Sequence, residues 1–224
     1  MAKGWTWSYS KFKNFVVCPK RNYEVDIAKN YTDSSEQLVW GNQVHAALAQ
    51  ACLGKTPLPD SMRDYQHWVD QMVDKPGRPG KLLVEQKLAL TEDFQATSFF
   101  ANNVWYRGVC DVARLDGAIG LARDWKTGKI LEDSRQLMLM AQLLFVHNPL
   151  LKDIKTEFVW LKDDCVTGEW FRRDTIMRNW PPVLDVVKQM KHAADTLTYP
   201  PIPGRLCARH CPVLSCPFHG KSHR

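Results

Sequence analysis

Two acidic residues and a lysine near the middle of the chain have the types and spacing that phosphodiester hydrolysis requires. Asp124 and Lys126 stand two residues apart in a segment typical of a β-strand, so their side chains are expected on the same face. Asp111 belongs to the preceding extended segment. If the turn between the segments centres near Gly117 and Ala118, Asp111 lies opposite Asp124, and two carboxylates and an ammonium group converge on one point.

Paired carboxylates of this kind hold a hard divalent cation such as Mg²⁺ or Mn²⁺ through oxygen ligands. The cation polarises a phosphate and acidifies a bound water, and a nearby lysine stabilises the charge that develops in the transition state. An aspartate and a lysine two residues apart are also common by chance, and they fit an ordinary ion pair on a solvated strand. The neighbouring motifs decide between these interpretations.

Four short motifs follow one another along the chain. They are residues 41–45, which begin with Gly41 and end with His45; residues 108–111, which end with Asp111; residues 124–128, which read Asp-Trp-Lys-Thr-Gly; and the pair that begins with Gln136. In this order they resemble the RecB-like branch of the PD-(D/E)XK nuclease superfamily. The resemblance implies an α/β protein with a PD-(D/E)XK restriction-endonuclease-like core, in which helices flank a mixed central β-sheet.

The resemblance also implies a role for each matching residue. The metal ligands would be His45, Asp111, Asp124 and the main-chain carbonyl of Trp125. Lys126 matches the catalytic lysine, and Gln136 matches a helix glutamine that braces the active site or contacts substrate. Glu85 falls where many members carry a further acidic residue. The family often has a tyrosine four residues after the glutamine, but Met140 stands there in this chain, so that contact is absent.

A histidine beside Val44 and Leu48 on one helix face is more often a core or surface residue than a ligand. The place of His45 in the ordered set favours the ligand role instead. Its imidazole would shift the metal preference somewhat from Mg²⁺ towards Mn²⁺.

Three of the seven cysteines crowd together near the C-terminal end, at Cys207, Cys211 and Cys216. A tetrahedral metal site needs four ligands, and Cys18, at a turn before Pro19, is the natural fourth. Four thiolates suit an iron–sulfur cluster or zinc. Two nearby histidines, His210 and His219, keep zinc open as an alternative, and three unbound cysteines in a tail are the remaining interpretation.

The cysteine pattern, together with residues 8–23, resembles a subset of RecB-like nucleases that includes the AddB nuclease subunit, the CRISPR spacer-adaptation nucleases and many phage exonucleases. Members of this subset bring one early and three late cysteines together around a [4Fe–4S] cluster. The resemblance implies one nuclease domain over residues 1–224, in which residues 1–34 and 199–224 come together as the cluster-binding subregion. The C-terminal part would be a cysteine-bound appendix with a structural role.

Apolar spacing and turn residues predict the elements that position these groups. Helices are expected at residues 9–17, 35–53, 60–73, 134–145 and 174–197. Strands are expected at residues 82–91, 104–115, 118–126, 154–161 and 169–172. The last two strands would turn around Thr167 and Gly168, and the last helix would bend at Pro181 and Pro182. The segment after residue 199 is expected to be irregular.

The bulk composition is compatible with a nucleic-acid partner. The net charge is +6 and the isoelectric point is about 8.9, which fits an anionic ligand without requiring one. No apolar run is long enough for a signal peptide or a membrane span, so the expected location is the cytoplasm, or the host cytoplasm if the chain is phage-encoded. Positive residues near the cysteines could hold phosphates, and Trp5, Trp7 and Tyr9 could stack on bases.

The expected function is that of a divalent-metal-dependent DNA nuclease, an exonuclease acting on single strands or DNA ends in recombination, replication or phage DNA processing. The expected cofactors are Mg²⁺ or Mn²⁺ and a [4Fe–4S] cluster, with zinc as the alternative. A recombination or replication protein, or further copies of the chain, are candidate partners. The alternatives are a CRISPR spacer-adaptation nuclease, a non-catalytic DNA-binding module of the same fold, and a zinc-bound interaction protein.

Overall fold

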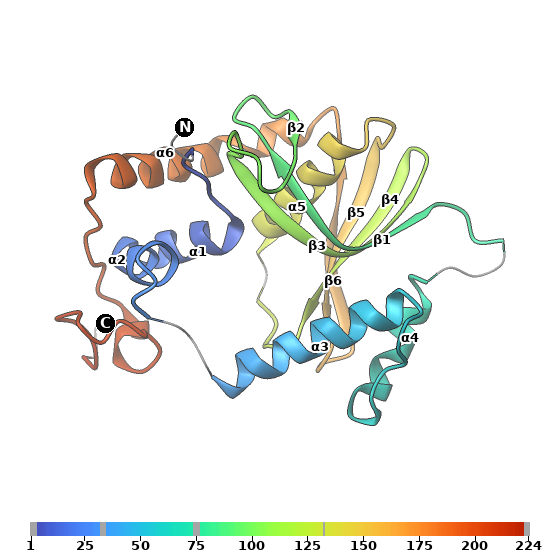
Figure 1. Ribbon diagram of the computed structural model, residues 1–224, viewed down its shortest axis with the longest axis horizontal. Helices are drawn as coiled ribbons and strands as arrows, with labels where there is room; N and C mark the ends of the chain where they lie inside the picture. The colour runs from blue at the N-terminus through green and yellow to red at the C-terminus, as the bar shows by residue number, and fades with distance from the viewer. Residues whose placement is uncertain (1–3, 32–34, 74–76, 132, 222–224) are drawn as a thin grey trace. The chain divides into compact units, whose positions relative to one another are not determined.

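The computed structural model describes residues 4–31, 35–73, 77–131 and 133–221. Within it the chain divides into two compact units, each made of segments distant in sequence (Figure 1). The sheet unit comprises residues 1–6 and 35–179, and the cysteine unit comprises residues 7–34 and 180–224. No helix of the described chain has the length and apolar character needed to cross a membrane.

A mixed β-sheet is the centre of the sheet unit, as the sequence predicts, but it has six strands where five are expected, because the short β2 was not predicted. In spatial order its strands are β2 (Ala96–Thr97), β1 (Lys81–Leu90), β3 (Tyr106–Asp116), β4 (Ile119–Lys126), β5 (Asp153–Trp160) and β6 (Cys165–Arg172). Strands β4 and β5 pair in parallel, and the helix between them in sequence makes the crossover that this direction requires. The other neighbouring strands pair antiparallel. The β3–β4 register ends with Val112 opposite Arg123, so Asp111 and Asp124 are the next positions along the two strands, as predicted.

Helices cover the sheet from both sides and carry residues of the predicted site. Helix α3 (Glu36–Cys52) begins after Ser35, whose hydroxyl accepts a hydrogen bond from the Leu38 amide, and it packs with α4 (Gln66–Asp70) on one face. Helix α5 (Ser134–His147) begins after Asp133 and contacts β1, β3, β5 and β6. Its residues 137–145 are all buried, which makes it the central helix of this unit.

Two glycines of the predicted motifs allow helices to approach the sheet closely. A Cβ atom on Gly41 would lie 3.2 Å from the Thr127 hydroxyl, so this position lets α3 contact the loop after β4. A Cβ atom on Gly108 would lie 3.0 Å from Leu143 of α5. Both motif glycines therefore act through packing, since neither has a positive φ.

The cysteine unit is built on α1 (Tyr9–Val17) and α6 (Pro181–Thr196), which contact each other. Helix α1 is followed directly by α2 (Pro19–Asn22) and one π-helical turn (Tyr23–Ile27). Trp7 and Trp180 are fully buried and meet edge to face, with ring centroids 6.4 Å apart. The suggestion that Trp7 stacks on bases is therefore wrong, because its ring is part of this core.

After α6, the described residues up to 221 contain one short regular element, a 3₁₀ turn at Arg205–Ala208. Hydrogen bonds tie the segment to the first helices. The Ile202 amide donates to Cys18 Sγ, and the Ser215 amide donates to the Tyr31 hydroxyl at 3.0 Å. The predicted irregular segment is confirmed.

Three predicted elements differ in the structure. The helix expected at residues 60–73 is a 3₁₀ turn (Asp60–Tyr65) followed by the short α4, which ends at Asp70. The β5–β6 turn lies at residues 161–164 and not at Thr167 and Gly168, which pair inside β6. Pro181 begins α6 and does not bend a longer helix, because proline fits the first helical turn, where no amide donor is needed.

Arg173 holds the end of α5 against the connection to β5. Its guanidinium donates to the carbonyls of Phe145, Asn148 and Leu151 at 2.6–2.7 Å. We expect Arg173→Met to lower the free energy of unfolding by roughly 2–3 kcal/mol, because buried acceptors lose charged donors. Thermal unfolding should show a fall in Tm of roughly 4–10 °C. Arg172→Met is the matched control, since this neighbour is exposed; equal effects of the two variants would contradict the prediction.

Candidate active site

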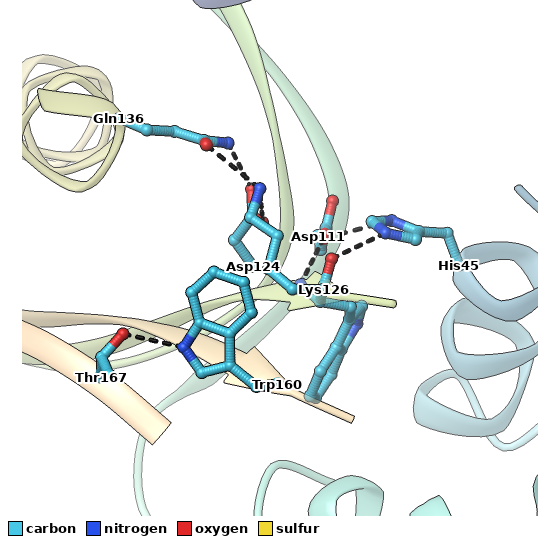
Figure 2. A network of polar contacts seen from close by, with 8 residues as sticks. His45, Asp111, Asp124, Lys126, Gln136, Trp160 and Thr167 are labelled. Carbon is cyan, nitrogen blue, oxygen red and sulfur yellow. Dashed lines mark hydrogen bonds and ion pairs between the residues drawn. The ribbon is translucent and has the colours of Figure 1, made fainter. Parts of the chain in front are cut away.

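The predicted catalytic residues of β4 and α5 form one hydrogen-bonded group in the sheet unit. Lys126 Nζ lies 2.6 Å from Asp124 Oδ2 and donates a hydrogen bond to Gln136 Oε1 at 3.1 Å. The amide of Gln136 in turn donates to Asp124 Oδ1 at 2.7 Å. Figure 2 shows the three side chains closing this triangle, with Gln136 reaching down from its helix. The triangle fixes the orientation of both the carboxylate and the ammonium group.

His45 and Asp111 meet beside this triangle. His45 Nδ1 lies 3.2 Å from Asp111 Oδ2, and its Nε2 lies 2.9 Å from the Trp125 carbonyl (Figure 2). The same Asp111 oxygen accepts a hydrogen bond from the Trp125 amide at 2.9 Å. Burial lowers the pKa of His45, but its hydrogen bond to Asp111 and the charges of Asp111 and Asp124 outweigh burial and raise it. A protonated imidazole would donate from both nitrogens here.

Glu85 joins the group from β1 through an unusual backbone conformation. Its φ is 48°, in the left-handed region, although Val84 and Gln86 on either side both pair with β3. One ligand atom each from Glu85, His45 and Asp111 lie within 4.8 Å of one another. Burial and the charge of Asp111 raise the pKa of Glu85. Strained conformations of this kind are concentrated at functional sites.

A cleft of about 770 Å³ in the sheet unit is lined by the residues of this group other than Asp111. One wall is the face of α3 that contains His45, and the floor includes Glu85, Asp124 and Lys126. The wall also contributes amide side chains that the motif comparison does not single out: Gln37, Asn42 and Gln50. Their helical spacing relative to His45 is the only sequence signal that could have found them.

Asp124 is an ionisable group in an unfavourable environment. Burial raises its pKa to about 6, against the charge of Lys126, which lowers it, while the charge of Asp111 raises it further. Its Oδ2 atom is buried and is paired with the Lys126 ammonium at 2.6 Å. Each carboxylate oxygen has more than one lone pair, so the ionised group can also bind a cation.

We expect Asp124→Asn to stabilise the metal-free protein. The pKa of Asp124 is raised in the folded state, so the free energy of unfolding falls as the pH rises from about 4 to about 6. It stays lowered at higher pH. Asparagine cannot ionise, so at pH 7.5 the variant should be more stable by roughly 2–3 kcal/mol, and equal to the wild type below pH 4. Urea unfolding in EDTA at both pH values measures this. The control is Asp116→Asn at the exposed hairpin; a variant less stable than the wild type at pH 7.5 would refute the argument.

The predicted cluster ligands lie together in the cysteine unit. Cys18, Cys207, Cys211 and Cys216 all line one cavity of about 220 Å³. No three thiols of the described chain come within 4.8 Å of one another, so the sulfurs are not gathered around a single-ion position. The Gly204 amide donates to Cys207 Sγ at 3.4 Å, as the Ile202 amide does to Cys18 Sγ at 3.3 Å.

Positive and apolar side chains complete the cavity wall. As predicted, Lys20, Arg21 and Arg205 lie beside the cysteines. Arg21 Nε is buried without a hydrogen-bond partner among the described residues. The apolar part of the wall consists of Val17, Pro201, Ile202, Leu206, Val213 and Phe218. Val17, Ile202 and Leu206 are partly exposed, and Lys20 also pairs with Glu24 at 3.1 Å, so the cavity has a mixed apolar and positively charged wall that is open to solvent in part.

No family model matches the sequence, and no curated protein does. Two solved structures are similar to the model over nearly the whole chain. The crystal structure of SSO0001 is 13% identical, with a TM-score of 0.47, and the match covers 97% of this chain and 89% of that chain. The crystal structure of a candidate exonuclease from Eubacterium rectale is 12% identical, with a TM-score of 0.51. This match covers 95% of this chain and 90% of that chain. At this identity the second match shows a shared fold, and the first carries no further weight.

Proposed function

We propose that the chain is a divalent-metal-dependent DNA nuclease of the RecB-like type, an exonuclease that acts on single strands or DNA ends. The observation that carries the proposal is the convergence of His45, Glu85 and Asp111 within 4.8 Å, beside the triangle of Asp124, Lys126 and Gln136. The fold shared with the Eubacterium rectale candidate exonuclease is consistent with it.

The donor set fits a hard or borderline divalent cation. The carboxylates of Glu85 and Asp111 converge with the imidazole of His45, and the Asp124 carboxylate on the neighbouring strand can add a further oxygen ligand. The Trp125 carbonyl, a proposed backbone ligand, also accepts from His45 Nε2 and keeps a second lone pair. A bound Mg²⁺ or Mn²⁺ would supply Lewis acidity and a water of lowered pKa. Oxygen ligands with one nitrogen are compatible with Mn²⁺ at least as well as with Mg²⁺.

Each residue then has a defined task. Lys126 presents a positive charge at the floor of the cleft, where it stabilises negative charge on a phosphate oxygen and orients the attacking water. Gln136 fixes the positions of the Lys126 and Asp124 side chains relative to each other through its two hydrogen bonds. His45 would hold the metal through a ring nitrogen that carries no proton, so its raised pKa would make metal binding depend on pH.

The cleft suits a nucleic-acid backbone. It is open to solvent along α3, and the amides of Gln37, Asn42 and Gln50 offer neutral donors to phosphate oxygens. A non-catalytic DNA-binding module would have no need of a buried carboxylate with a pKa raised to about 6, because burying it only destabilises the fold. The raised pKa of Asp124 therefore favours an enzyme over a binding module.

We extend the proposal to the cavity of the cysteine unit, which we assign to a [4Fe–4S] cluster. The four cysteines line it, two of their sulfurs accept backbone hydrogen bonds, and three cations balance thiolate charge. A single zinc ion holds sulfurs about 3.8 Å apart, given Zn–S bonds of about 2.3 Å, whereas a cluster of four irons spreads its thiolates further. The wider spacing of the thiols supports the cluster over zinc.

Cleavage of end-labelled DNA by anaerobically purified protein tests the proposed function. Single-stranded and duplex substrates are incubated with Mg²⁺, Mn²⁺ or EDTA, and products are resolved on a sequencing gel. Degradation with either metal and none in EDTA is expected, and the ladder gives the polarity. A folded, metal-supplemented protein that cuts neither substrate would refute the proposal.

A further inference from the structure

Two phenylalanines at the β2 edge of the sheet unit form an aromatic pair that core packing does not explain. Phe99 and Phe100 follow β2 in a turn of the sheet unit, and the Phe100 side chain is 72% exposed. Their rings meet edge to face, with centroids 5.0 Å apart. The turn is fixed by a hydrogen bond from the Thr97 hydroxyl to Asn103 Oδ1 at 2.8 Å. The turn therefore presents a defined aromatic surface.

Two cations lie against these rings. Lys87 Nζ lies 6.0 Å from the Phe99 centroid and 5.7 Å from that of Phe100, and the Arg107 guanidinium lies 5.0 Å from Phe99. Neither cation forms an ion pair with a carboxylate in the part of the chain that the structure describes. Their charges are thus available to an external anion.

The same strands connect this surface to the active site. Lys87 follows Glu85 by two residues on β1, and Arg107 precedes Asp111 by four residues on β3. At about 3.4 Å per residue, the two cations lie about 7 and 14 Å along the strands from the metal-ligating groups. A stacked nucleic-acid strand rises about 3.4 Å per nucleotide, so this span is about two to four nucleotides.

Part of the sheet face between these points is exposed. Lys87 pairs with Val109, and both are exposed, while the next residues, Leu88 and Cys110, are buried. Ala89, which pairs with Arg107 nearer the phenylalanines, is also buried, so the exposed stretch of β1 extends from Glu85 to Lys87. Isolated exposed apolar residues need no explanation, but an aromatic pair flanked by unpaired cations on such a face does.

We propose that Lys87, Phe99, Phe100 and Arg107, the phenylalanine patch, bind single-stranded DNA beside the scissile phosphate. The cations contact phosphates and Phe100 stacks on an unpaired base. A duplex keeps its base faces stacked inside, so the patch favours single strands. This inference rests on the proposed nuclease function and assigns the substrate class of the same site.

Binding is measured by fluorescence anisotropy with a labelled oligothymidine, in the Lys126→Ala background so that the probe is not cut. Phe100→Ala should weaken binding about five- to tenfold, and the pair Lys87→Ala with Arg107→Ala should reduce the slope of log Kd against log salt by about 1.4. Binding of a blunt duplex should change less than twofold with Phe100→Ala. Trp170→Ala is the matched control, because this tryptophan is 60% exposed on β6, at the opposite edge of the sheet.

A second assay separates failure of this inference from failure of the proposed function. The p-nitrophenyl ester of thymidine 5′-monophosphate is too short to reach the patch, so Phe100→Ala should turn it over at the wild-type rate with Mn²⁺. Normal turnover together with unchanged single-strand affinity in all patch variants would overturn the inference and leave the nuclease intact. Equal losses for Phe100→Ala and Trp170→Ala would overturn it as well.

Discussion

Lys126→Ala is expected to lower the rate of DNA cleavage by about 10²–10³-fold while leaving the fold intact. The ammonium group is the cation of the chain closest to Asp124 Oδ2, at 2.6 Å, and the Gln136 side chain holds it in place. Loss of one preorganised group that stabilises transition-state charge has an effect of this size. The loss should fall on kcat more than on KM, because the group acts in the transition state.

Single-turnover cleavage of end-labelled DNA with saturating Mn²⁺ measures the effect. Lys162→Ala is the matched control, since Lys162 is exposed just after β5, outside the cleft. Circular dichroism should match the wild type for both variants, and Tm should match it for Lys162→Ala. Lys126→Ala leaves the buried Asp124 carboxylate without its ion-pair partner, so a lower Tm is expected for this variant. Cleavage by Lys126→Ala at the wild-type rate would remove the lysine from the reaction and, with it, the main support for the assignment of this site.

The central part of the site could be predicted from the sequence because it is local. Asp124 and Lys126 share a strand face by spacing alone, and the hairpin turn places Asp111 at the position opposite Asp124. His45 and Gln136 could be assigned to the site only from the ordered motifs. Local sequence rules do not predict that two helices meet at the end of one strand. Their roles remain predictions, although the structure places both side chains at that point.

Other features depend on tertiary packing and leave little trace in the sequence. Gly168 looks like a turn residue, but it lies inside β6, where a Cβ atom would come within 2.5 Å of the Thr156 carbonyl. The left-handed backbone of Glu85 is stabilised only by the surrounding sheet, so strand propensity could not show it. Likewise, the exposure of Phe100 follows from the turn after β2, a strand too short to predict.

Cys211→Ser is expected to lower the stability of the cysteine unit and its metal content together. Regular structure is scarce in the segment after residue 199, and its apolar contacts surround the cavity that contains the four cysteines. A metal group bound only by the folded form adds its binding free energy to folding. Replacing one ligand should therefore reduce the free energy of unfolding by at least about 2 kcal/mol, a fall in Tm of roughly 4–8 °C.

Metal analysis and absorption spectra of anaerobically purified protein provide the decisive readout. The wild type should contain iron and absorb visible light, and Cys211→Ser should lose both along with stability. Cys165→Ser is the matched control, because Cys165 begins β6 in the sheet unit and does not line the cavity. Zinc in place of iron, without colour, would replace the cluster with a zinc site and require the thiols to move closer than they are here. A colourless wild type without either metal, as stable as Cys211→Ser, would reduce the four cysteines to packing residues.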